Sequence, residues 1–130
     1  MGNATACGWS WNARMPPETA YIAEPLGTTT TAVAVAGEVT FSNVVDFDRA
    51  LGQALDEAQN LVVDLTGVTF IDSSGLSSLL TASARARDGG GTVALVLAQG
   101  EPPSIFRFRG VDRLLSLYPS RDAALEALRR

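Results

Sequence analysis

The most informative part of the sequence is the stretch at residues 63–76, which reads VDLTGVTFIDSSGL. It overlaps the end of a nearly continuous apolar run at 61–65, which is typical of a central strand that is covered on at least one face. It ends where apolar residues recur every three to four positions, which is the period of a helix. Asp72 fits the N-cap of that helix, and Ile71 and Leu76 have the spacing of a hydrophobic staple. The stretch therefore predicts a buried strand, a loop and a helix.

Apolar runs and segments with helical periodicity alternate on both sides of this stretch. Ser42 and Asn43 predict a cap for the helix before it, and Ser120 predicts a cap for the last helix. The glycines at 89–91 predict the turn that ends the helix after Asp72. In chain order, the sequence predicts strands near 21–23, 31–36, 61–65, 92–97 and 115–118, and helices near 44–58, 73–87, 104–109 and 121–128.

This alternation predicts an α/β fold in which helices pack on a four- or five-stranded sheet. The first two strands follow each other directly, whereas later strands are joined by helical crossovers that favour parallel neighbours, so we expect a mixed sheet. Each helix has only one apolar stripe, and we therefore expect the helices mainly on one face. In the helix after Asp72, Leu79 and Ala84 are expected to face inward and Ser78 outward.

The composition excludes most catalytic chemistry. All ten basic residues of this 130-residue chain are arginines, and the chain has no histidine. Without histidine there is no imidazole base and no Ser-His-Asp relay. Without lysine there is no Walker-type phosphate clamp and no Schiff base. Carboxylate chemistry, hydroxyl chemistry and binding remain open for a single domain of this composition, and we expect no metal site and no cofactor.

The net charge and the chain ends indicate the expected surroundings. The net charge is −4 and the arginines are scattered among 14 carboxylates, so nucleic acid is not an expected partner. Cys7 is the single cysteine, and no leader or membrane-length apolar segment stands out, so we expect a cytoplasmic protein without a membrane partner. Residues 1–18 lack any helix or strand period and predict a poorly ordered tail, with the domain at 19–130. In that tail, Trp9 and Trp11 could dock on the domain or on a partner.

Ser73, Ser74 and Gly75 open the helix that Asp72 is expected to cap. Capping does not explain Gly75, because glycine in a helix costs up to about 1 kcal/mol relative to alanine. The glycine is explained if another backbone or an active site must approach the two hydroxyls. A hydrolase nucleophile at Ser73 is excluded, since the Gly-x-Ser-x-Gly signature and a histidine are both missing. A phosphate acceptor fits better, because a phosphate there lies beside backbone amides and the positive end of the helix dipole.

A resemblance to a known family adds what spacing cannot supply. The stretch DLTGVTFIDSSGL at 64–76 resembles the signature of STAS domains, specifically of bacterial anti-sigma factor antagonists. Gly-Glu-Val at 37–39 is similar to the family's Gly-Glu-Leu/Ile opening, and residues 105–114 and 120–128 resemble its C-terminal pattern. The resemblance covers residues 27–128.

The resemblance implies a partner switch rather than catalysis. In that family, an unphosphorylated antagonist binds an anti-sigma factor that is also a serine kinase of the GHKL ATPase type, and so frees a sigma factor. The kinase phosphorylates the antagonist, which is then released, and a PP2C-type phosphatase restores it. Ser73 matches the family's phosphoacceptor, with Ser74 the less favoured acceptor. Asp72 matches the acidic neighbour that shapes the recognition loop, and Ser74 and Gly75 match the rest of that loop.

One position, Thr40, departs from the family pattern, and two more, Phe70 and Ile71, need interpretation. The family often has aspartate after the Gly-Glu-Leu opening, where this chain has Thr40, so Thr40 is the candidate partner contact at that end of the surface. Phe70 and Ile71 are expected to anchor the loop in the core rather than to touch a partner.

Two alternatives to the partner switch remain. One is a STAS module that serves as a scaffold or as a subunit of a larger assembly, of the stressosome or lipid-transport type. The Ser73-Ser74 pair favours the switch, because a purely structural module has less need of an exposed hydroxyl. The other is an enzyme that uses the carboxylates of Asp64 and Asp72, but an Asx-type hydrogen bond is the ordinary explanation for Asp64 at the end of a strand.

Overall fold

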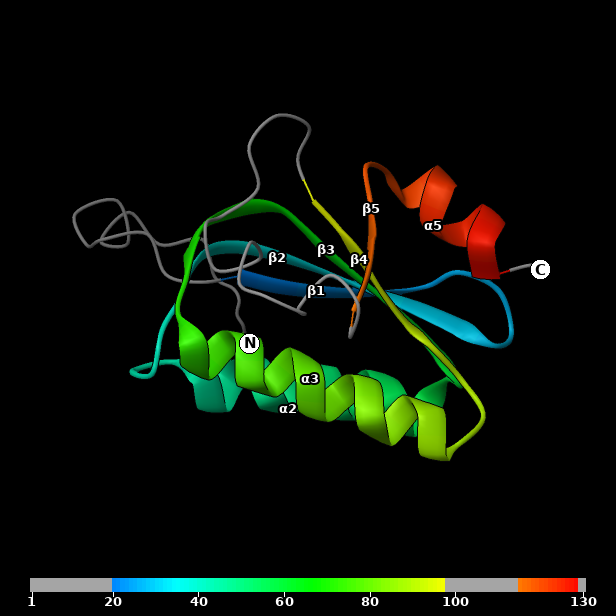
Figure 1. Cartoon of the computed structure of the whole chain (residues 1–130), viewed down its shortest axis with the longest axis horizontal. Coiled ribbons are helices and arrows are strands. Elements are labelled where there is room, and N and C mark those ends of the chain that lie inside the picture. Colours follow the sequence, from blue (N-terminus) through cyan, green and yellow to red (C-terminus); the bar gives the residue numbers. More distant parts are fainter. Residues whose placement is uncertain (1–19, 98–114, 129–130) are drawn as a thin grey trace, which may run out of the picture.

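The computed structural model of the chain describes residues 20–97 and 115–128. The helix expected at 104–109 and all of the N-terminal tail expected at 1–18 lie outside these residues. The described part forms one five-stranded sheet with three helices (Figure 1). Its elements are β1 (Ala20–Pro25), β2 (Thr30–Val39), α2 (Val44–Glu57), β3 (Asn60–Ile71), α3 (Ser73–Asp88), β4 (Val93–Val96), β5 (Ser116–Tyr118) and α5 (Arg121–Leu128).

The sheet is mixed, and its strands lie side by side in the order β1-β2-β3-β4-β5. β1 and β2 are antiparallel because a short turn joins them, and Gly27 provides a positive φ of 106° in that turn. The pairs β2–β3, β3–β4 and β4–β5 are parallel. The prediction of a mixed α/β sheet is confirmed.

The helices lie mainly on one face of the sheet. Figure 1 shows α2 and α3 side by side below the sheet and α5 above it. The main core lies between the sheet and α2 and α3 and includes Phe47, Leu51 and Leu79, and a smaller core beneath α5 includes Val62 and Ala124. Successive residues of β3 therefore point into different cores, which explains its nearly continuous apolar run.

β3 is longer than predicted. It continues beyond residue 65 to Ile71, through a stretch that was expected to be a loop. The extension is stabilised by β2, which also continues past its predicted end to Val39 and pairs with β3 as far as Ile71. The pairing shifts register twice along the way, and Gly37 has a φ of 101° at the second shift. Sequence patterning missed this part of the strand because its exposed threonines and irregular register break the apolar period.

α3 also differs from its predicted orientation. Ser78 and Ser83 are buried, whereas Ala84 is exposed, although Ala84 was expected to face inward and Ser78 outward. The reason is that α3 packs against α2 as well as against the sheet, so a broader face of the helix is covered. Small side chains are suited to such close packing between two helices.

On the opposite face, Arg121 links α5 to two strands. Its Nε donates to Asp64 Oδ2 at 2.8 Å, and Nη1 donates to Glu24 Oε1 at 3.2 Å. The Thr66 amide and hydroxyl donate to Asp64 Oδ1, which confirms the Asx-type bond expected there. Burial alone raises the pKa of Asp64, but the hydrogen bonds from Thr66 and Arg121 outweigh it and hold the pKa below its usual value. Asp64 is thus bound within this network and is not brought together with Asp72.

Candidate functional site

The candidate site lies where β3 ends and α3 begins. Asp72 is the N-cap of α3, and its Oδ1 accepts hydrogen bonds from the amides of Ser74 at 2.9 Å and Gly75 at 3.2 Å. The Ser74 hydroxyl donates to the same oxygen. The predicted cap is therefore confirmed, and it fixes the backbone of the first turn of α3.

Asp72 also holds the loop between β2 and α2. Its Oδ2 accepts a hydrogen bond of 3.0 Å from the Phe41 amide, and its own amide donates to the Val39 carbonyl at 3.1 Å. Asp72 and Phe41 are 31 positions apart in the chain, so local sequence signals did not reveal this contact. One carboxylate thus positions both segments that form this end of the molecule.

The loop at residues 40–43 is closed by its own polar side chains. Asn43 Oδ1 accepts from the Thr40 amide at 2.9 Å, and Asn43 Nδ2 donates to the Glu38 carbonyl at 2.9 Å. Asn43 occupies the N-cap position of α2, as the predicted capping pair implies, but its side chain makes no cap hydrogen bond. The side-chain amide of Asn43 instead stabilises the loop through its bonds to Thr40 and Glu38. The Thr40 and Ser42 hydroxyls form a hydrogen bond with an O···O distance of 2.7 Å.

The hydrogen bonds at Asp72 favour its charged form. The bond from the Ser74 hydroxyl contributes most to lowering the pKa of Asp72. Burial opposes it and is the second-largest effect, but the Gly75, Phe41 and Ser74 amides lower the pKa further, so that the net shift is downward. A carboxylate that accepts several N–H and O–H bonds is strongly favoured over its protonated form. The cap is therefore ionised at neutral pH.

We expect Asp72→Asn to lower the thermal midpoint at neutral pH. Because the pKa of Asp72 in the folded chain lies below its usual 3.8, its charge stabilises the fold above that pH, and the contribution is lost as the pH falls through the folded-state value. The difference in midpoint between wild type and variant should therefore shrink in acid. Thermal melts followed by circular dichroism over a pH series measure it. Asp48→Asn is the control, since it removes an exposed carboxylate of α2 that caps no helix. An Asp72→Asn effect that stays constant through the acid range contradicts the charged cap.

Ser73 and Ser74 differ in how their hydroxyls are used. Ser73 is the first residue of α3 and is exposed, and its hydroxyl makes no hydrogen bond to any residue within 20–97 or 115–128. Ser74 is half-buried, and its hydroxyl is bonded to Asp72. Of the two hydroxyls, that of Ser73 is therefore the one accessible for reaction.

Gly75 has a packing role that the sequence interpretation did not anticipate. Gly75 is buried, and a Cβ built there lies 2.6 Å from Ile71 Cγ1 and 2.9 Å from Val39 Cγ1. The missing side chain therefore lets α3 start close against the ends of β2 and β3. The interpretation that glycine is needed for another molecule to approach the hydroxyls is corrected, because the approaching atoms belong to this chain's own core.

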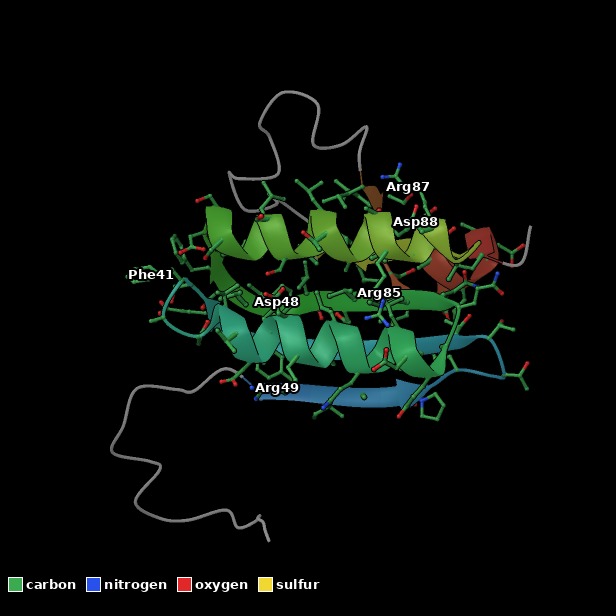
Figure 2. The ribbon with its side chains drawn as sticks, turned by 90° about the horizontal axis from the view of Figure 1, so that it is seen from below. Phe41, Asp48, Arg49, Arg85, Arg87 and Asp88 are labelled. Atoms are coloured by element: carbon green, nitrogen blue, oxygen red, sulfur yellow. The ribbon has the colours of Figure 1, made fainter. Side chains whose placement is uncertain are left out.

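Large apolar side chains are exposed at this end of the molecule. Phe41 is 80% exposed and Val45 is 64% exposed. In Figure 2, Phe41 extends outward from the end at which α2 and α3 begin. Phe70 is 49% exposed, so the expectation that it anchors in the core is wrong, whereas Ile71 is buried as predicted. The two residues differ because successive side chains of a strand point to opposite faces. The sequence signal for this surface is the apolar Phe41 among the polar residues Thr40, Ser42 and Asn43.

A groove runs between α2 and α3 from the serine end of the site. It has a volume of 420 Å³, and its lining includes Val44 and Ser74 near one end and Arg85 near the other. Arg85 reaches from α3 across to α2, where it pairs with Asp56 and donates to the Gly52 carbonyl at 3.2 Å (Figure 2). The sequence did not predict this groove, because it depends on how the two helices pack.

The described residues offer little for metal or membrane chemistry. No three of their His, Cys, Asp or Glu side chains are grouped so as to hold a metal ion. In the same residues, every helix is too short or too polar to span a bilayer.

The arrangement of this sheet and its helices is that of a known domain family. The model of the STAS domain matches residues 22–124, and the chain belongs to the STAS domain family. No curated protein matches the chain.

Solved structures add a closer comparison. The chain is similar to an anti-sigma factor antagonist from Mycobacterium paratuberculosis, with 26% identity, a TM-score of 0.77, and coverage of 87% of this chain and 96% of that one. It also resembles the anti-sigma factor antagonist SpoIIAA in its unphosphorylated form, at 17% identity and a TM-score of 0.64 over 85% and 98% of the two chains. The phosphorylated form of SpoIIAA, a Bacillus cell fate determinant, matches at 17% identity and a TM-score of 0.60 over 83% and 98%. At that identity, SpoIIAA supports the fold alone.

Proposed function

We propose that this chain is an anti-sigma factor antagonist that works by partner switching. In its unphosphorylated form it binds an anti-sigma factor that is a serine kinase of the GHKL type, and so frees a sigma factor. Phosphorylation of Ser73 ends the complex, and a phosphatase of the PP2C type restores the binding form. The observation that carries the proposal is the exposed Ser73 hydroxyl at the start of α3, which bonds to none of the described residues, beside a Ser74 hydroxyl that donates to Asp72.

The local structure suits reversible phosphorylation. A phosphate on Ser73 lies at the N-terminus of a 16-residue helix, where the helix dipole favours negative charge. The Asp72 carboxylate is turned toward the Ser74 and Phe41 amides, and these bonds partly satisfy its charge. We therefore expect the fold to tolerate the added charge, while a partner surface facing Ser73 does not.

The surface around Ser73 suits a protein partner. Phe41 is the most exposed large apolar side chain of the described residues, and Asp72 holds its backbone close to the start of α3. Exposed aromatic side chains are frequent anchors of protein interfaces. Thr40 lies in the same loop, so the proposed partner surface joins Thr40 and Phe41 to Ser73. Gly75 is buried and contributes by letting α3 begin at this place.

Phe41→Asp tests this surface directly. We expect it to weaken binding of the anti-sigma factor kinase by at least about tenfold, because truncating an interface anchor commonly costs more than 1 kcal/mol. Isothermal titration calorimetry with the purified kinase measures the change. Ala84→Asp is the matched control, because it adds the same charge at an exposed position of α3 well away from Ser73.

The same titration separates this function from a structural role. The proposal expects tight binding by wild type and Ala84→Asp and weakened binding by Phe41→Asp. Equal binding by all three proteins contradicts the proposed surface. Failure of wild type to bind any GHKL-type kinase of its own organism contradicts the switch and favours a scaffold within a larger assembly.

A further inference from the structure

Part of the sheet face opposite α2 and α3 is uncovered. α5 lies over β3, β4 and β5. On β1, the Tyr21 ring packs toward α2, with its centroid 6.1 Å from that of Phe47. Because side chains alternate along a strand, the next residue, Ile22, points to the α5 side, where it is 66% exposed. Ile22 is thus a large apolar side chain on a part of this sheet face that the α5 helix does not cover.

The residues beside Ile22 extend it into an apolar strip. Ile22 pairs with Ala34 across β1 and β2, and Ala36, which is exposed, pairs with Gly67 of β3. Phe70 lies at the rim of the strip on the same side of the sheet. The alanines and the glycine have small side chains or none, so the strip is shallow between the larger Ile22 and Phe70. We call these five residues the apolar strip.

The network around Arg121 limits the strip at its other end. Arg121 extends from α5 to Glu24 on β1 and to Asp64 on β3, and so passes over β2. The small alanine side chains of β2 leave room for this crossing. Beyond Arg121 toward Phe70, no described element lies over the strip.

We propose that the N-terminal segment at residues 1–19 folds back onto the apolar strip and covers it with Trp9 and Trp11. The segment joins the sheet at Ala20, which pairs with Ala36 of the strip. Both tryptophans of the chain lie in this segment. Each indole can bury about 150–250 Å² of surface, which is enough to cover exposed Ile22 and its neighbours.

The geometry permits this contact. Trp11 precedes Ala20, the first residue of β1, by nine positions, and a chain of that length reaches up to about 30 Å when extended. The strip is two strand spacings wide, which is about 10 Å. Because the segment is tethered beside the strip, its effective concentration there is on the order of millimolar, and weak intrinsic affinity suffices. Pro16 and Pro17 lack the N–H groups that a strand ladder needs, which disfavours a simple extension of β1.

Tryptophan fluorescence of the full chain tests the proposal, because all of it comes from this segment. We expect the emission maximum to be blue-shifted, and acrylamide quenching to be weaker, relative to a peptide of residues 1–19. Ile22→Asp should move both values to those of the peptide, and Ile22→Leu should retain the wild-type values. Val45→Asp is the matched control, since Val45 is about equally exposed at 64% but lies on α2.

Three outcomes overturn the proposal. The first is a wild-type chain whose tryptophans are quenched as readily as those of the peptide. The second is protection that survives Ile22→Asp while circular dichroism shows the fold intact. The third is protection that disappears on dilution, which assigns the strip to a second copy of the chain. The measurement needs no kinase, so its failure leaves the proposed partner switch untouched.

Discussion

Ser73→Asp is expected to weaken binding of the anti-sigma factor kinase by about a hundredfold, because burying an unpaired charge in an interface costs several kcal/mol. The aspartate mimics part of the phosphate charge at the position where the partner is proposed to dock. The thermal midpoint should stay close to that of wild type, since a carboxylate at the start of a helix is favoured by the dipole. Calorimetric titration and thermal melts measure the two effects separately.

Ser73→Ala distinguishes charge from the loss of the hydroxyl. It removes the Ser73 hydroxyl without adding charge, and that hydroxyl bonds to none of residues 20–97 or 115–128. We therefore expect binding close to that of wild type. If Ser73→Ala and Ser73→Asp weaken binding equally, electrostatic release is wrong and the hydroxyl itself is a contact.

Gly75→Ala is expected to lower the free energy of unfolding by about 1–2 kcal/mol. Forcing a methyl group into a packed core costs about 1–3 kcal/mol, and the better helix propensity of alanine returns up to about 1 kcal/mol. The crowding is specific, since the new Cβ would lie 2.6 Å from Ile71 Cγ1 and 2.9 Å from Val39 Cγ1. Urea denaturation of the purified variant measures the loss.

Gly52→Ala is the matched control within a helix. A Cβ at Gly52 finds its nearest neighbour, Arg85 Nη1, at 3.5 Å, which is ordinary van der Waals contact. The same substitution should therefore stabilise the chain by up to about 1 kcal/mol through helix propensity. Two helical glycines are thus expected to respond with opposite signs. A Gly75→Ala variant as stable as Gly52→Ala would show that the contacts of Gly75 with Val39 and Ile71 are not a constraint.

Local signals in the sequence predicted the parts of the site that depend on neighbouring residues. Asp72 caps α3 through residues two and three positions ahead, and Ser120 caps α5 in the same way, with its hydroxyl accepting from the Ala123 amide at 3.1 Å. Such contacts depend on spacing along the chain. The buried strand at 61–65 was found because both of its faces are apolar.

Contacts between segments that are distant in the sequence could not be predicted from these local signals. The Phe41 amide meets Asp72 only because β2 and β3 run parallel and end together. Gly75 was misread for the same reason, since the Val39 side chain that approaches it belongs to another strand. Phe70 was expected in the core because its side chain is apolar. The two register shifts between β2 and β3 decide which face of β3 it occupies, and no local sequence signal reveals them.

Phosphopeptide mapping by mass spectrometry tests the central claim most directly. The full chain is incubated with its GHKL-type anti-sigma factor kinase and ATP, alongside Ser73→Ala and Ser74→Ala. The account predicts a single phosphate on Ser73 in wild type, none on Ser73→Ala, and retained modification of Ser74→Ala. Phosphate found only on Ser74, or no phosphate on wild type with a kinase that binds it, contradicts the account.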